Sequence, residues 1–178
     1  MKPDDTMTIK PYSRLVSLTV RPEHVFHFPN GLPAFEEFHD FVFAIKPDTS
    51  PFIFMHALEP AGLSFVCIDP FHICPEYAPR ISLSDQAFLG DPKAEGLMLL
   101  SIVTVRADVR ETTANLQAPL AINIENSIGR QILCEGQSYP IRYRIWNMIE
   151  AAEAAPEGSE DHIAEPGTPT IIESTVNA

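Results

Sequence analysis

Histidine and cysteine are the residue types in this chain that most often hold metals or act as nucleophiles. His24 and His27 are three residues apart, and on an extended segment that spacing turns the two imidazoles to opposite faces. The histidines at His39, His56 and His72 have no partner ligands at a spacing typical of zinc sites. We therefore expect surface or packed histidines and no metal site.

Three cysteines, Cys67, Cys74 and Cys134, lie scattered in apolar surroundings, and no two of them have the C-x-x-C spacing. An odd number of cysteines without that spacing argues against a disulfide framework and against a redox or zinc site. We expect buried free thiols in a protein of the reducing cytoplasm.

Residues 62–66 read Gly-Leu-Ser-Phe-Val, which begins like the G-x-S-x-G nucleophile motif but ends in valine. That motif holds its serine on a turn between a strand and a helix, whereas Ser64 begins an apolar, strand-like run. The chain also has no glycine-rich loop for phosphates. These observations give little support to a hydrolase and no sign of a phosphate-binding cofactor site.

The most unusual polar segment spans residues 110–120, where Thr, Asn and Gln occur without the charges of an ordinary exposed loop. Asn and Thr side chains can hydrogen-bond the nearby backbone and keep an irregular loop rigid. Asn115 and Gln117 could therefore satisfy backbone groups at the end of a barrel, or they could belong to a rigid polar surface for a partner. The residue types leave both interpretations open.

The composition excludes several classes of function. The chain has 178 residues, is 45% hydrophobic and carries a formal charge of −12. Nucleic-acid binders need basic patches, and anionic membrane surfaces repel acidic proteins, so we expect neither direct nucleic-acid binding nor membrane association. An acidic protein of this kind would instead attract a basic protein partner.

Acidic residues concentrate at the C-terminal end. Residues 147–178 hold seven of the 24 acidic residues, none of the 12 basic residues and no aromatic residue. Such a segment buries too little apolar surface to offset the entropy of ordering. We expect one folded domain over residues 1–146, followed by an acidic, disordered tail over 147–178.

The folded part reads as short strands separated by turns. β-branched and aromatic residues concentrate in nine segments, 15–20, 25–28, 41–45, 52–58, 63–68, 97–106, 120–124, 127–134 and 141–145. This pattern predicts an all-β, mainly antiparallel, small β-barrel-like domain. One or two short helices are expected, at 84–89, which opens with the capping residue Ser84, and at 34–38 after Pro33.

Alternation along the strands predicts their faces. Residues 97–103 are apolar at nearly every position, which is typical of a central strand covered on both sides. Asn123 and Glu125 alternate with isoleucines and should face water. Arg142 and Arg144 alternate in the same way with Ile141, Tyr143 and Ile145.

Residues 112–123, which we call the rim, read Thr-Thr-Ala-Asn-Leu-Gln-Ala-Pro-Leu-Ala-Ile-Asn. This segment resembles the most recognisable motif of the flagellar assembly factor FliW family. Three further segments, 28–35, 51–55 and 65–77, resemble other family segments in the same order, so the resemblance covers about residues 14–146. Two departures are Ala34, where the family pattern has glycine, and the acidic tail after Trp146.

The resemblance implies a cytoplasmic, non-enzymatic regulator with a β-barrel-like fold. Proteins of this family bind flagellin and the carbon storage regulator CsrA, a small RNA-binding dimer that blocks translation of flagellin messenger RNA. Free FliW antagonises CsrA allosterically, so flagellin synthesis follows flagellar assembly. A monomer is expected when no partner is bound, and the expected partner-binding residues are Thr112, Thr113, Asn115, Leu116, Gln117, Pro119 and Asn123.

Two other functions compete with this interpretation. A small-molecule-binding β-barrel, with or without hydrolase activity, would need an interior cavity lined by a few convergent polar groups. A structural subunit would self-associate through exposed strand edges, which the net charge of −12 opposes. The many bulky apolar residues favour a filled interior over a cavity.

Overall fold

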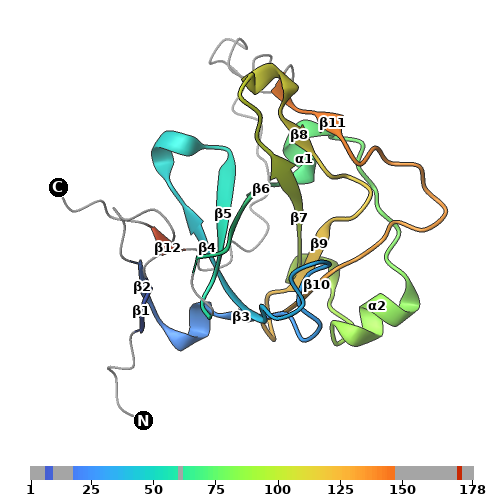
Figure 1. Ribbon diagram of the computed structural model, residues 1–178. Helices are drawn as coiled ribbons and strands as arrows, with labels where there is room; N and C mark the ends of the chain where they lie inside the picture. The colour runs from blue at the N-terminus through green and yellow to red at the C-terminus, as the bar shows by residue number, and fades with distance from the viewer. Residues whose placement is uncertain (1–6, 10–17, 60–61, 147–171, 174–178) are drawn as a thin grey trace, which may run out of the picture.

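The computed structural model describes residues 7–9, 18–59, 62–146 and 172–173, and most of its regular structure is β-strand (Figure 1). Seven strands close into a barrel, because β9 pairs with both β10 and β7. In barrel order they are β3 (Phe26–His27), β4 (Asp40–Ile45), β5 (Phe52–Ala57), β6 (Ser64–Ile68), β7 (Leu97–Thr104), β9 (Leu120–Asn123) and β10 (Ile128–Gln131). All neighbours are antiparallel except β10 and β3. The expected all-β, mainly antiparallel barrel is thus confirmed.

Strand β7 is the longest strand and lies in the middle of the sheet, as its apolar sequence predicts. One of its edges pairs with β6. The other edge pairs with β9 over Leu97–Leu100 and then with β8 (Thr113–Ala114) over Val103–Thr104. Strand β11 (Tyr143–Arg144) pairs with the far side of β8. We call the end of β7, the loop 105–112, β8 and residues 141–146 the flap, which rises at the top of Figure 1.

Aromatic side chains fill the barrel interior. Phe28 and Phe41 meet edge to face with ring centroids 5.2 Å apart, and both are fully buried. Gly129 lies against the Phe28 ring, where an added Cβ would come within 2.4 Å of the ring. A filled interior lowers the free energy of folding, because apolar surface leaves water and packs closely.

A second apolar cluster lies outside the barrel, beneath the flap. Ile68 and Val103 from the barrel wall pack there with Ala114, Leu116 and Ile145 of the rim and flap. The flap is therefore fixed to the barrel by a core of its own, and its outer surface has a defined position.

Two short helices connect the barrel strands. Helix α1 (Pro70–Ile73) begins after Asp69, whose side chain accepts the N–H of Phe71. This helix was not among those expected. Helix α2 (Leu83–Phe88) agrees with the helix expected at 84–89. Its cap is Ser82 rather than Ser84, because the Ser82 hydroxyl accepts the N–H of Asp85.

The prediction of a helical turn at 34–38 is wrong. Leu32 and Phe35 instead exchange backbone hydrogen bonds across a tight turn. Pro33 sits at its second position and Ala34 at its third, with φ of +69° at Ala34, which is the arrangement of a type II turn. That third position favours glycine, so the departure of Ala34 from the family pattern has a structural cost.

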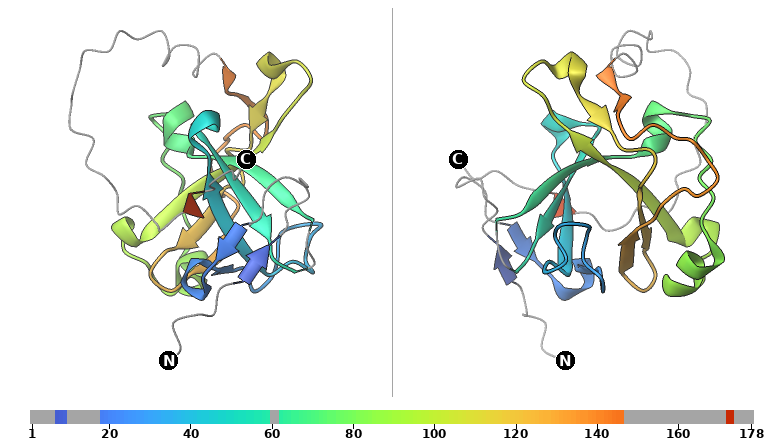
Figure 2. Two further views of the ribbon diagram at one scale, coloured as in Figure 1. Left: turned by 90° about the vertical axis from the view of Figure 1, so that its left-hand side faces the viewer. Right: turned by 45° about the vertical axis from the view of Figure 1, so that its right-hand side comes forward.

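Further elements lie around the barrel. They are β1 (Met7–Ile9), β2 (Leu18–Val20), β12 (Ile172–Glu173) and four 3-10 turns, η1 (Pro22–His24), η2 (Pro47–Thr49), η3 (Ala94–Gly96) and η4 (Val109–Glu111). Figure 2 shows β1 and β2 beside the barrel, away from the flap. Most of the expected acidic tail lies outside the described residues. Within it, Ile172–Glu173 pair in parallel with Ala44–Ile45 of β4, where an irregular chain was expected.

We expect Ala34→Gly to stabilise the domain by about 0.5–1 kcal/mol, because relief of the left-handed backbone outweighs the added entropy of the unfolded chain. The midpoint of urea unfolding measures the change. Ala94→Gly, at an exposed position in η3 without a positive φ, should instead destabilise the domain. A lower midpoint for Ala34→Gly would contradict the prediction.

Candidate functional site

The rim lies where β7 changes partners along one edge. The chain leaves β8 at Ala114 and enters β9 at Leu120, and both strands pair with β7. Residues 115–119 must therefore make a compact irregular turn between two paired strands (Figure 1). Backbone groups in such a turn have no ladder partners and need side chains to satisfy them.

Asn115 supplies the first of these side chains. Its Oδ1 accepts the backbone N–H groups of Gln117 and Ala118, at 3.1 and 3.0 Å. Its own backbone N–H donates to the carbonyl of Ile102 on β7. Asn115 thus ties the turn to the barrel and holds it in shape.

Gln117 connects the turn to the irregular chain segment that follows β10. Its Nε2 donates to the carbonyl of Cys134 at 2.9 Å, and the backbone N–H of Cys134 donates back to the carbonyl of Gln117 at 3.0 Å. Gln131 of β10 donates through its Nε2 to the carbonyl of Ala118 at 2.8 Å. The side chains of both Gln117 and Gln131 therefore serve the backbone of this region.

Leu116 is fully buried, and its carbonyl accepts the hydroxyl of Tyr77 at 2.7 Å. Burial, followed by the hydrogen bond to Cys134, raises the pKa of the Tyr77 phenol far above its usual range. The hydroxyl therefore stays protonated and keeps donating. Burial also raises the pKa of the Cys134 thiol, so this free cysteine stays a thiol and packs as a small apolar residue.

The seven expected partner-binding residues divide by exposure. Four are buried and cannot reach a partner through their side chains, namely Thr112, Leu116, Pro119 and Asn123. Three are half-buried, namely Thr113, Asn115 and Gln117. The side chains of Asn115 and Gln117 satisfy backbone groups, as one of the two interpretations expects. Among the described residues, the half-buried Thr113 has no side-chain hydrogen bond.

Asn123 corrects an expectation from alternation. It was expected to face water, yet it is only 3% exposed. Its Nδ2 donates to the carbonyl of Leu89 at the end of α2, and its Oδ1 accepts the N–H of Glu125. The physical reason is that α2 covers this face of β9, which alternation alone does not indicate.

The structure brings two arginines beside the rim. Arg144 lies opposite Thr113 in the pairing of β11 with β8, and Arg142 is two residues before it. Both arginines are exposed and Ile145 is buried, as their alternation predicts, whereas Ile141 is 64% exposed. Sequence reasoning did not place Arg142 and Arg144 at the rim, because pairing between distant segments sets their position.

A serine and a histidine meet elsewhere on the barrel. The Ser64 hydroxyl lies 2.7 Å from Nδ1 of His56 on the neighbouring strand. Burial, followed by the nearby charge of Lys46, lowers the pKa of His56 to about 4, which makes it a weak base. Within the described part of the chain, no carboxylate hydrogen-bonds this imidazole. The pair therefore lacks the group that orients the base in hydrolases.

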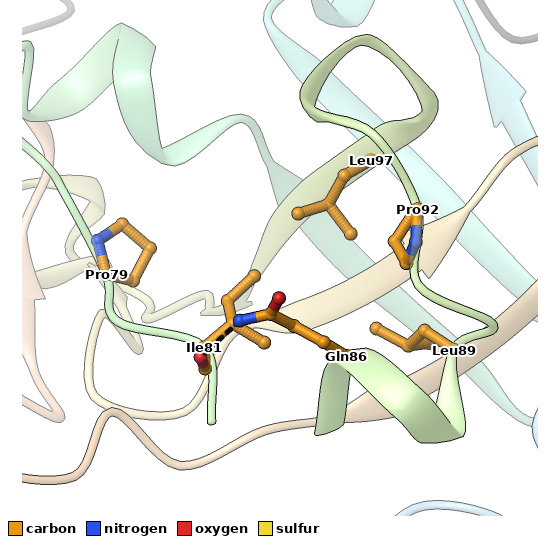
Figure 3. Close-up of a pocket in the computed structure, with 6 residues that line it drawn as sticks. All are labelled: Pro79, Ile81, Gln86, Leu89, Pro92 and Leu97. Atoms are coloured by element: carbon orange, nitrogen blue, oxygen red, sulfur yellow. Dashed lines mark hydrogen bonds between the residues drawn. The ribbon is translucent and has the colours of Figure 1, made fainter. Parts of the chain in front are cut away.

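A pocket of about 260 Å³ opens beside α2, outside the barrel (Figure 3). Its lining residues are Pro79, Ile81, Gln86, Leu89, Pro92 and Leu97. The one polar side chain among them, Gln86, donates to the carbonyl of Ile81. This pocket thus lies outside the barrel interior and lacks the free, convergent polar side chains that a small-molecule site needs.

The described residues hold neither a metal-binding group nor a membrane-spanning helix. Among them, no three His, Cys, Asp or Glu side chains gather as a group that could hold a metal ion. No helix among them is long and apolar enough to span a bilayer. Burial raises the pKa of Cys67 to about 12, which leaves this free thiol unreactive at neutral pH.

Comparison with known proteins decides the family. The model of the FliW protein family matches residues 11–145, which include the barrel, the rim and all of the flap except Trp146. The chain belongs to the FliW family. A flagellar assembly factor FliW from Desulfitobacterium hafniense is 36% identical over 150 residues, which cover 83% of this chain and 97% of that protein. One from Caldicellulosiruptor saccharolyticus is 35% identical over 136 residues, covering 75% and 88% respectively.

A solved structure of FliW shares the fold. It superposes with a TM-score of 0.72 at 27% identity and covers 78% of this chain and 96% of that one. Membership in the FliW family supports a role in flagellar assembly, and the name assembly factor implies a non-enzymatic role. The resemblance on the Asn-Leu-Gln-Ala-Pro segment therefore led to the right family, and in this chain Asn115 and Gln117 of that segment hydrogen-bond the backbone.

We expect Asn115→Ala to destabilise the domain by about 1–2 kcal/mol, because two backbone N–H groups lose their acceptor. Asn115→Asp keeps an acceptor oxygen at the same place and should cost much less. Urea unfolding of both variants measures the difference. Equal loss in the two variants would contradict a role for the Oδ1 acceptor.

We expect the free energy of unfolding to fall as the pH drops from about 6.5 to about 4. In that window the unfolded imidazole of His56 is protonated while the folded one is not, so protons favour the unfolded state. Urea unfolding across this range, compared with His56→Gln, measures the contribution. The variant should show a shallower slope, and His72→Gln serves as the exposed control. A slope unchanged in His56→Gln would contradict the assignment.

Proposed function

We propose that this protein binds flagellin and the RNA-binding regulator CsrA in alternation, and antagonises CsrA when flagellin has been exported. The observation that carries the proposal is the family match over residues 11–145. Accumulated flagellin would occupy the protein and leave CsrA free to repress translation of flagellin messenger RNA. Binding to CsrA would act away from its RNA site and relieve that repression.

The charge of the chain supports this choice of partners. A formal charge of −12 favours approach to a basic RNA-binding protein and disfavours RNA in the same complex. The same charge opposes self-association, in agreement with a protein that is monomeric in the cytoplasm until it meets a partner.

We further propose that the rim contributes to a partner surface through the half-exposed side of Thr113, Asn115 and Gln117. The buried members of the set, Thr112, Leu116, Pro119 and Asn123, act by holding that surface in shape. Because Asn115 and Gln117 also serve the backbone, Thr113 is the cleaner position for a test.

We expect purified protein to bind CsrA and flagellin separately in calorimetric titrations, and flagellin to displace CsrA from the complex. Thr113→Trp adds bulk on the rim and should weaken at least one interaction about tenfold or more. Ala94→Trp, at an exposed site on η3, is the matched control.

Three outcomes would contradict parts of this proposal. Binding of flagellin alone would remove the regulatory half. Binding of neither partner would overturn the whole function. Wild-type affinities in a folded Thr113→Trp variant would exclude the rim and leave the partner exchange intact.

A further inference from the structure

The flap carries an unusual concentration of positive charge for so acidic a protein. Arg106, Arg110, Arg142 and Arg144 are four of the 12 basic residues of the chain, and all four are exposed. Among the described residues, no carboxylate forms an ion pair with any of these guanidinium groups. The flap itself adds only the acids Asp108 and Glu111, whereas the rest of residues 1–146 holds 15 acidic and 8 basic residues.

Strand pairing defines the position of Arg144 on the flap. Pairing places Arg144 opposite Thr113, and Thr113 opposite Thr104. Residues paired in register share a face of the sheet, so these three side chains form a row across β11, β8 and β7. Arg142 lies in the turn immediately before β11, two residues from Arg144, and its side chain is exposed as well.

The opposite face of the flap is the buried one. The next register positions form a second row on that face, made of Tyr143, Ala114 and Val103. These side chains pack in the apolar cluster beneath the flap. The face that carries Arg144 therefore points away from this cluster, and Arg144 is exposed. Figure 2 shows the flap strands at one end of the barrel.

Aliphatic side chains accompany the arginines. Val105, Val109 and Ile141 are 59%, 46% and 64% exposed, and they are three of the six large hydrophobic residues exposed in the described part of the chain. A surface that combines arginine with exposed apolar side chains is typical of protein–protein contacts.

Strand β11 also offers a free backbone edge. Within the described residues it is the last strand of the sheet and pairs only with β8. The N–H of Ile145 donates to the carbonyl of Thr112, so Ile145 and Thr112 form a hydrogen-bonded pair. In an antiparallel ladder such pairs alternate, and the backbone N–H and C=O of Arg144 consequently point away from β8.

We propose that the flap is the docking site for an acidic, extended segment of flagellin, which adds a strand to the free edge of β11. Side chains of an added strand would lie beside those of β11, so an acidic residue of that strand would meet Arg144, and Arg142 lies in the turn just before β11. The inference rests on the proposed function, which names flagellin and CsrA as the partners. A basic RNA-binding protein is repelled by four arginines and binds the acidic remainder of the surface instead.

The test is a calorimetric titration of the full chain with purified flagellin and, separately, with CsrA. Arg142→Glu combined with Arg144→Glu should raise the Kd for flagellin at least tenfold in low salt and leave the affinity for CsrA unchanged or tighter. The control is Arg80→Glu combined with Lys93→Glu, which makes the same charge change at exposed positions outside the flap. The control should stay within twofold of wild type for flagellin, and unfolding midpoints confirm that both variants fold.

The outcomes separate this inference from the function on which it rests. If the wild type binds flagellin and both double variants bind it equally, the flap is not the site and the proposed function stands. Weakened CsrA binding in place of weakened flagellin binding would overturn the choice of occupant. If the wild type binds neither protein, the proposed function fails and the inference fails with it.

A second measurement identifies what lies on the flap. A photoreactive benzoylphenylalanine placed at Ile141 should crosslink to an acid-rich peptide of flagellin, identified by mass spectrometry. Crosslinks only to residues 147–178 of the chain itself would show that its own acidic segment occupies the flap. Crosslinks only to a second copy of the chain would show self-association, and either result would overturn the proposal.

Discussion

The structure depends on one edge of β7 that serves two strands at once. Each stretch of a strand edge can hydrogen-bond only one partner, so the first half of this edge binds β9 and closes the barrel, and the second half binds β8 and starts the flap. The chain must then pass from Ala114 to Leu120 without leaving this edge. The position and compactness of the rim turn follow directly from that constraint.

Side chains in and near the rim supply the hydrogen bonds that the backbone of this turn needs. Asn115, Gln117 and the neighbouring Gln131 place their side-chain amides on backbone groups that have no strand partner, and Tyr77 satisfies the carbonyl of Leu116. A buried carbonyl or N–H left without such a partner costs about 1–3 kcal/mol. The most recognisable segment of the family is thus explained largely by stability, and its contribution to binding is to hold the neighbouring surface in place.

Charge divides the surface of the protein into two parts. The flap presents four arginines, and the remainder of residues 1–146 has an excess of acidic side chains. An acidic partner and a basic partner would therefore meet different surfaces. The rim links these two surfaces, because Thr113 pairs with Arg144 of the flap and the backbone N–H of Asn115 donates to β7 of the barrel. Electrostatics of this kind sets the orientation and rate of association more than its affinity.

The sequence by itself determined the fold class, the family, most strands, the central place of β7 and the outward faces of Arg142 and Arg144, because these follow from local periodicity and from a motif. It could not determine that Asn123 is buried, since α2 covers β9 from a distant part of the chain. It also could not place β8 or bring Arg142 and Arg144 to the rim. Pairing between segments about 30 residues apart decided those positions, and such pairing depends on the closed barrel rather than on any local pattern.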